Sequence, residues 1–149
     1  MLEVTKKIEF DMGHRLPKYE GKCRHLHGHR YVLLVTVKGK TQEDGSDEGM
    51  VIDFAKLKAA MSEVVEGLDH RMMLSINDPI IQGYYQHSSE DYDKDRMERD
   101  GILIVDFVPT AENIAVWIWR KLLVKLLKSE MSVTKVQLYE TPTSVVEVS

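Results

Sequence analysis

The sequence predicts an α+β fold in which a mainly antiparallel sheet of four strands carries two helices on one face. Two observations support this prediction. Strand-like runs lie toward both ends of the 149-residue chain, at residues 2–14, 29–40, 133–140 and 144–149. Between them, residues 53–66 and 110–126 repeat apolar side chains at helical spacing. No internal repeat interrupts this order, so we expect a single domain over residues 1–149.

The first two strands are predicted from different patterns. In residues 2–14 most apolar side chains share one parity and therefore one strand face: Leu2, Val4, Ile8, Phe10 and Met12. His14 continues this parity. Residues 29–40 are instead enriched in β-branched and aromatic side chains. The acidic, glycine-containing stretch 41–49 is predicted to be a turn that closes a hairpin onto residues 50–54.

Both helices are predicted to begin at a side chain that caps the first turn. Asp53 caps a helix that runs to about Glu66. Its apolar stripe comprises Phe54, Leu57, Met61, Val64 and Leu68. Thr110 follows Pro109 and caps the second helix. The stripe of that helix comprises Ala111, Ile114, Ala115, Ile118, Leu122 and Leu126. Residues 102–108, just before it, are strand-like.

Residues 77–101 are polar, charged and poorly periodic, and we interpret them as a long surface insertion within the domain. A structureless loop of this length is uncommon inside a compact domain. We therefore expect the insertion to hold a short helix or to carry a function of its own.

Composition and charge exclude several classes of function. The formal net charge is −4 and no basic block stands out, which argues against nucleic acid as the main partner. An anionic small substrate is still compatible, because local charge can oppose the net charge. The apolar runs are too short to span a bilayer, and the N-terminal residues do not resemble a signal peptide. With a single cysteine, we expect a cytoplasmic protein without a membrane partner.

Histidines are concentrated in residues 25–29. In a strand, His27 and His29 point to the same face, roughly 7 Å apart. His14, at the end of the preceding strand and on its core-facing side, is the best candidate for a third ligand. Three histidines that leave one position open are the ligand set of a catalytic zinc site. The alternative is a polar strand end with unrelated histidines, and His25 is expected to be a loop residue or a partner of the ligands.

Four further residues are candidates for chemistry, each with a simpler alternative. Cys23, four residues before His27, is a base or nucleophile if a metal lowers its pKa, and otherwise a small buried side chain. Asp69 and His70 follow the first helix and either form a proton-transfer pair or cap that helix. Glu140 ends a strand on its apolar side. It either binds a ring edge with two N–H donors or reaches water.

Together these motifs resemble the 6-pyruvoyl-tetrahydropterin synthase and 6-carboxytetrahydropterin synthase family. The resemblance covers about residues 2–76 and 102–148 and rests on FDMGHRLP, CRHLHGH, MVIDFAKLK, LDHRMML, PTAENIAVWIW and YET. It implies that zinc is bound by His14, His27 and His29. It also implies Cys23 as the catalytic thiol, with Asp69 and His70 as the proton-transfer pair. Glu140 would anchor the pterin ring, and we assign Thr110 to substrate binding as well.

The spacing between Cys23 and His27 indicates which reaction the resemblance implies. Three residues separate them, as in the 6-carboxytetrahydropterin synthases of the queuosine (7-deazaguanine) route, whereas the tetrahydrobiopterin-pathway enzymes typically have five. The implied reaction converts 7,8-dihydroneopterin triphosphate into 6-carboxytetrahydropterin, acetaldehyde and triphosphate. Three alternatives stay open: a 6-pyruvoyl-tetrahydropterin synthase, a dihydroneopterin-aldolase-like enzyme, and a non-catalytic, zinc-stabilised oligomeric binding domain.

The family resemblance also implies a quaternary structure. In the tunnelling fold, the sheets of several subunits join into a β-barrel, and the active sites form between subunits. A homo-oligomer is therefore expected, most simply a hexamer built from trimers. Two features depart from the family pattern: the long insertion at 77–101, and Met12-Gly13 where small residues such as alanine are common before the first zinc histidine.

Overall fold

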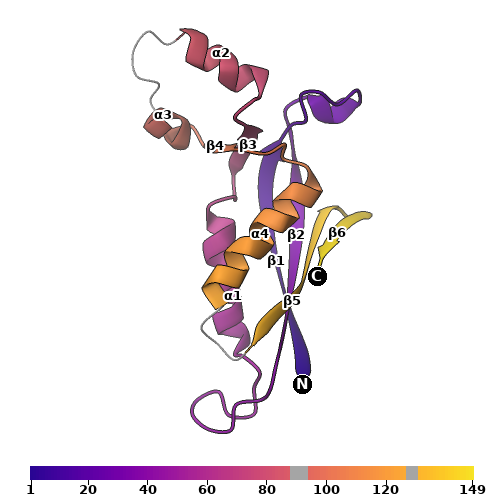
Figure 1. Ribbon diagram of the computed structural model, residues 1–149, viewed down its shortest axis with the longest axis vertical. Coiled ribbons are helices and arrows are strands. Elements are labelled where there is room, and N and C mark those ends of the chain that lie inside the picture. Colours follow the sequence, from indigo (N-terminus) through magenta and orange to yellow (C-terminus); the bar gives the residue numbers. More distant parts are fainter. Residues whose placement is uncertain (88–93, 127–130) are drawn as a thin grey trace.

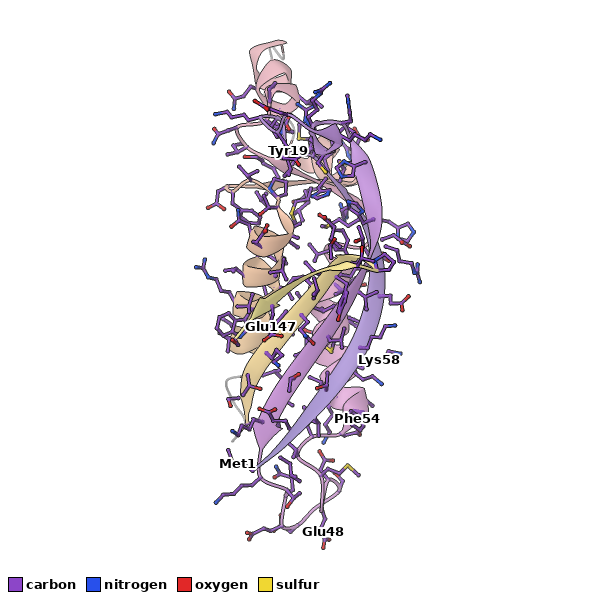
Figure 2. The ribbon with its side chains drawn as sticks, turned by 90° about the vertical axis from the view of Figure 1, so that its right-hand side faces the viewer. Met1, Tyr19, Glu48, Phe54, Lys58 and Glu147 are labelled. Carbon is purple, nitrogen blue, oxygen red and sulfur yellow. The ribbon has the colours of Figure 1, made fainter. Side chains whose placement is uncertain are left out.

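A computed structural model describes residues 1–87, 94–126 and 131–149 (Figure 1). In these residues, six strands form one sheet in the order β4-β3-β1-β2-β5-β6. Two long helices cover one face of the sheet, and two shorter helices extend from one end of the molecule. The long strands twist along their length, as Figure 2 shows from the side. None of the described helices is both long and apolar enough to cross a membrane.

Four of the strands are antiparallel, as predicted. They are β1 (Leu2–His14), β2 (His27–Gly39), β5 (Ser132–Thr141) and β6 (Ser144–Val148), and each pairs with the next. The predicted parity of β1 is confirmed toward its C-terminal end, where Phe10, Met12 and His14 are buried. The register of the first pair places His14 opposite His27. The strand pairing alone thus brings two of the predicted metal ligands together.

The prediction of a four-stranded antiparallel sheet is wrong, because two more strands extend it in the described residues. β3 (Arg71–Ser75) runs parallel to β1, and β4 (Ile102–Val105) runs parallel to β3. β3 and β4 are parallel because a helical connection returns the chain between them. β3 escaped prediction because its five residues follow a helix closely and include no β-branched side chain.

The two predicted helices are α1 (Phe54–Glu66) and α4 (Ala111–Leu126), which contact each other and the sheet. The N-caps are confirmed: the Asp53 carboxylate accepts the Ala55 N–H at 2.7 Å, and Thr110 precedes the first residue of α4. The apolar stripes form the main core with the sheet, and their fully buried members are Leu57, Met61, Leu68, Ile114, Ala115, Ile118 and Leu122. Phe54 departs from the prediction, because it is 50% exposed in the first turn.

The insertion at 77–101 contains two helices, α2 (Pro79–His87) and α3 (Lys94–Arg99), while residues 88–93 lie outside the described residues. Ile81 and Met97 from these helices are buried against Leu74 of β3, in a small cluster apart from the main core. The expectation of a short helix is confirmed. The helical pattern was hard to recognise because Gly83, a poor helix former, lies in the middle of α2.

Residues 50–54 do not form the predicted hairpin strand. The turn before them holds one isolated bridge, between Gln42 and Glu48. Val51 and Ile52 are buried without joining the sheet, and Asp53 then starts α1 at once. Val51 and Ile52 therefore belong to a linker whose apolar side chains pack into the core. No strand forms here because α1 begins directly after the cap at Asp53.

Candidate metal and active site

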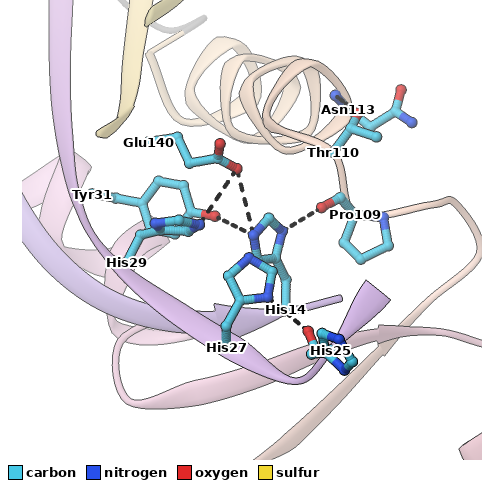
Figure 3. A network of polar contacts seen from close by, with 9 residues as sticks. All are labelled: His14, His25, His27, His29, Tyr31, Pro109, Thr110, Asn113 and Glu140. Atoms are coloured by element: carbon cyan, nitrogen blue, oxygen red, sulfur yellow. Dashed lines mark hydrogen bonds and ion pairs between the residues drawn. The ribbon is translucent and has the colours of Figure 1, made fainter. Parts of the chain in front are cut away.

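The three predicted metal ligands converge on the helix-covered face of the sheet (Figure 3). His14 ends β1, and His27 and His29 lie at the start of β2 on one strand face. One nitrogen from each ring lies within 4.8 Å of the others. Among the histidine, cysteine and carboxylate side chains of the described residues, these three histidines are the group whose spacing could hold a metal ion. The predicted geometry of the histidines is thus observed.

Backbone carbonyls fix the orientation of two of these rings. The Nδ1–H of His14 donates to the Pro109 carbonyl at 2.7 Å, and the Nδ1–H of His27 donates to the His25 carbonyl at 2.7 Å (Figure 3). Each bond leaves the Nε2 lone pair available on the other side of the ring. Metal-binding histidines are usually held by such a bond on the second nitrogen. His25 thus supports the cluster through its backbone, and its side chain is not part of it.

The electrostatics of the cluster favour the neutral form of His14 and His29. Burial lowers the pKa of His14, opposed by the bond to Pro109 and by the charge of Glu140. Burial also lowers the pKa of His29, again opposed by Glu140. The neutral form is the one that binds a metal, because a protonated ring nitrogen has no free lone pair.

The donor and acceptor content of the cluster fits a bound cation. The buried Nε2 atoms of His27 and His29 have no hydrogen-bond partner among the described residues. The Nε2 of His14 faces the Glu140 Oε1 at 3.4 Å, so two acceptors lie against each other when His14 is neutral with its proton on Nδ1. Buried unsatisfied acceptors are costly. A zinc ion would satisfy the three nitrogens, and the set matches an open, catalytic zinc site.

Glu140 reaches the cluster from the end of β5. Its Oε1 lies 3.4 Å from His14 Nε2 and 3.9 Å from His29 Nε2. The register between β5 and β6 shifts between Tyr139 and Thr141, so Glu140 lies in a bulge outside the regular pairing. The predicted orientation toward the apolar side is observed, and the side chain remains 23% exposed. The carboxylate can therefore face both the histidines and a ligand.

Tyr31 is a site residue that the sequence analysis missed. It lies two residues after His29 on the same face of β2, is fully buried, and its hydroxyl is 3.5 Å from His14 Nε2. Burial raises its pKa, and the charges of Glu140 and Cys23 raise it further, so the hydroxyl stays protonated. The alternation of His27, His29 and Tyr31 along one strand could have indicated that the tyrosine faces the cluster, but a tyrosine in a strand is also typical of simple core packing.

Thr110 lies beside the cluster at the start of α4 (Figure 3). Its hydroxyl accepts the Asn113 N–H at 3.3 Å, and Asn113 in turn donates its side-chain amide to the Val108 carbonyl at 2.9 Å. These bonds fix the turn that presents the Pro109 carbonyl to His14. In the described structure Thr110 is therefore a helix cap, and its predicted contact with substrate stays a prediction.

Cys23 lies outside the group of three histidines. It is in a short 3₁₀ helix, Lys22–Arg24, and is partly exposed. Its negative charge would act on Tyr31, whose hydroxyl adjoins His14. The group of side chains that could hold a metal ion, among the described residues, does not include Cys23.

Asp69 and His70 form the predicted pair, with His70 Nδ1 3.0 Å from Asp69 Oδ2. Asp69 also accepts the Asp11 N–H at 2.8 Å, and this bond is the main cause of its lowered pKa. His70 has a left-handed backbone, with φ of 59°, and donates its own N–H to the Asp11 carbonyl. The side chain of His70 is 78% exposed. The pair is therefore anchored to β1 but open to solvent.

The pair is not part of the histidine cluster of its own chain. His70 lines a cleft of about 550 Å³ whose other walls include Asp11, Gly28 and Arg30, and which His27 and His29 also border. Residues 28 and 30 alternate with His27 and His29 along β2, so their side chains point to the opposite face of the sheet. Within one chain, Glu140 therefore contacts the histidine cluster, whereas Asp69 and His70 do not belong to it.

Comparisons with known proteins agree on one family. The sequence model of the 6-pyruvoyl tetrahydropterin synthase family matches residues 3–149. A 6-carboxy-5,6,7,8-tetrahydropterin synthase from Rickettsia bellii is 37% identical over 99% of this chain and all of that protein. An uncharacterised protein from Wolinella succinogenes has a similar structure, with TM-score 0.80 and 27% identity over 99% of this chain and 97% of that one. A 6-pyruvoyl tetrahydropterin synthase from Plasmodium falciparum superposes with TM-score 0.69 and 26% identity, covering 99% and 96% of the two chains.

Proposed function

Because the chain belongs to the 6-pyruvoyl tetrahydropterin synthase family, we propose that it is a lyase that makes 6-carboxy-5,6,7,8-tetrahydropterin. Its substrates are 7,8-dihydroneopterin triphosphate and water, and the other products are acetaldehyde and triphosphate. The observation that carries the proposal is the three-histidine cluster beside Glu140, in a chain whose full-length curated relative is named for making this product. The product would serve 7-deazaguanine biosynthesis.

Zinc is the metal that the donor set favours, held by His14, His27 and His29. When bound, it would act as a Lewis acid that acidifies the hydroxyl and C–H groups of the substrate side chain. The protein contributes orientation: the carbonyls of Pro109 and His25 hold two of the rings. The fully buried Tyr31 closes the inner side of the cluster.

Two groups are proposed to move protons on the substrate. Cys23, in the loop that joins β1 to β2, would remove a proton from the side chain as a thiolate. His70, held by Asp69, would exchange a proton at another carbon. Because His70 is exposed and opens onto the opposite face of the sheet, we propose that it serves the site of a neighbouring subunit. A shared site of this kind requires a homo-oligomer, and we propose a cytoplasmic hexamer whose sheets close into barrels.

Glu140 is proposed to hold the pterin ring. A carboxylate accepts two parallel N–H donors, which the pyrimidine edge of a pterin offers. Glu140 is partly exposed and lies outside the regular pairing of β5 with β6, so its carboxylate is accessible to a ligand. Thr110, at the start of α4 beside the cluster, is proposed to contribute a further polar contact. Fixing the ring in this way places the reacting side chain over the histidines.

The purified protein should be tested with 7,8-dihydroneopterin triphosphate after its metal content has been measured. We expect about one zinc ion per chain, as three ligands in one chain imply, and release of both triphosphate and acetaldehyde, detected by mass. Triphosphate without acetaldehyde would instead identify a 6-pyruvoyl-tetrahydropterin synthase, the name carried by the Plasmodium falciparum structure. Turnover of unphosphorylated dihydroneopterin would indicate an aldolase-like activity. Absence of turnover with every pterin would reject a catalytic role.

A further inference from the structure

A buried ion pair joins the insertion to the strand end that carries His14. The Nε of Arg15, the residue after His14, lies 2.8 Å from Asp78 Oδ2 at the start of α2. Asp78 is fully buried and the Arg15 side chain is only 17% exposed. Neither atom has a hydrogen-bond partner among the described residues, so charge attraction is what compensates their burial.

The Asp78 side of this pair is fixed by the fold. Its Oδ1 accepts the Ile80 N–H at 2.8 Å, which caps the first turn of α2. Its own N–H donates to the Ser75 carbonyl at 2.9 Å at the end of β3. α2 is in turn held by Ile81, which is fully buried against Leu74 of β3. Asp78 is therefore a fixed negative charge that belongs to the rigid sheet edge.

The Arg15 side of the pair begins the loop that carries Cys23. The Leu16 N–H donates to the Cys23 carbonyl at 2.8 Å, which closes the loop on itself. The 3₁₀ helix around Cys23 contains no buried residue, so apolar packing does not fix it. Between Leu16 and Arg24, the described hydrogen bonds stay within the loop. The ion pair at Arg15 is thus the polar link that ties this end of the loop to the rest of the fold.

The loop also has room to shift. A cavity of about 520 Å³ separates its residues Leu16–Tyr19 from the turn before α4, which includes Phe107 and Thr110. Side chains that border a cavity lose contacts on one side and are held less firmly. If the ion pair were broken, the loop could therefore move toward this space and take Cys23 with it.

We propose that Arg15 and Asp78 are positioning residues that hold the Cys23 loop beside the histidine cluster. Neither touches the reacting atoms. Asp78 acts through Arg15, and Arg15 acts through the Leu16–Cys23 bond. The inference rests on the proposed function in giving Cys23 a catalytic task, but the placement of the thiol can be measured without substrate. It also gives the insertion a role, because α2 supplies the fixed charge.

The test compares Asp78→Asn with Asp53→Asn in the full-length, metal-loaded protein. Both residues cap a helix through the same type of bond, and asparagine preserves a cap, but Asp53 has no ion pair to the loop. Because the chain has one cysteine, its rate of alkylation by iodoacetamide reports on Cys23 alone. In Asp78→Asn we expect this rate to change at least about threefold and kcat to fall about tenfold, with KM within about twofold. Asp53→Asn should match the native protein in all three.

Two further variants separate positioning from general stability. Arg15→Lys keeps the charge and should recover part of the native alkylation rate and kcat, whereas Arg15→Gln should behave like Asp78→Asn. Should Asp78→Asn fail to fold, Arg15→Gln provides the same comparison. A lower melting temperature with native alkylation and native kcat would overturn the proposal. If the native protein turns over no pterin, the proposed function fails, but the alkylation rates still decide whether the pair positions Cys23.

Discussion

The histidine cluster and the Asp69–His70 pair lie on opposite faces of the same sheet, and they are built in opposite ways. The cluster is enclosed: His14 is 1% exposed, and two of its rings are held by carbonyls of the same chain. The pair is open: His70 is 78% exposed, and its backbone is left-handed, with φ of 59°. One half of the candidate site is complete within one chain, while the other half faces outward.

This difference shows how one chain can hold a stable, enclosed histidine cluster and still leave another candidate site residue exposed. Groups that must be neutral and close together, such as metal-binding imidazoles, need burial and fixed partners. A group that completes another subunit's site must instead be exposed in the isolated chain. The exposure of His70 is therefore what the proposed shared site requires. The following predictions test the two halves separately and then together.

The largest effect is expected from removing a ligand of the enclosed half. His27→Ala should lower the zinc content below about a tenth of native and reduce turnover by at least about 10³-fold, because two histidines rarely retain catalytic zinc. Metal analysis and a product assay measure both. His25→Ala is the matched control: its carbonyl orients His27 and remains, so zinc and turnover should be native. Loss of zinc in His25→Ala would mean that the side chain, too, is a ligand.

The second prediction combines the two halves. Cys23→Ala and His70→Ala should each reduce turnover by about 10²–10⁴-fold, as expected for lost proton-transfer groups. When the two variants are co-expressed and form mixed oligomers, about one quarter of native activity should return, because random pairing restores that share of sites formed between subunits. Mixtures as inactive as the separate variants would instead place the thiol and the imidazole in one site of a single chain.

The smallest effect concerns the open half alone. His70→Gly should raise the free energy of unfolding by about 0.5–1 kcal/mol, because glycine adopts the left-handed conformation without the strain of a Cβ atom. His70→Ala retains the Cβ and should not gain this stability. Urea unfolding of both variants, compared with the native protein, measures the difference. Equal stability of the glycine and alanine variants would show that the backbone at His70 is not strained.

Local patterns in the sequence were enough to predict much of this fold. Asp53 and Thr110 begin helices as expected, and the parity of Phe10, Met12 and His14 decided a strand face correctly. β3 was missed because its place in the sheet comes from pairing with β1, which outweighs its weak intrinsic preference. A strand that is stabilised by pairing with a distant segment need not show alternating apolar residues, and five residues are too few for such a pattern to be recognised.

The candidate site shows the same division. His27 and His29 could be paired from a spacing of two, and His14 from its parity. The supporting groups could not be found in this way: the Pro109 carbonyl is 95 residues from His14, and a carbonyl leaves no trace in residue type. The side of the sheet on which His70 lies could not be predicted from the sequence either. It depends on where the end of α1 docks on β1, through the backbone of Asp11.

The bond from His14 to the Pro109 carbonyl also has a consequence for the order of folding. The β1–β2 hairpin already contains all three histidines within the first 29 residues, and such local pairing can form early. The ring of His14 is oriented only when the turn before α4, 95 residues later, docks against the sheet. During synthesis, the hairpin therefore emerges long before its site can mature. Binding of the proposed zinc ion would then be a late event that follows completion of the whole domain.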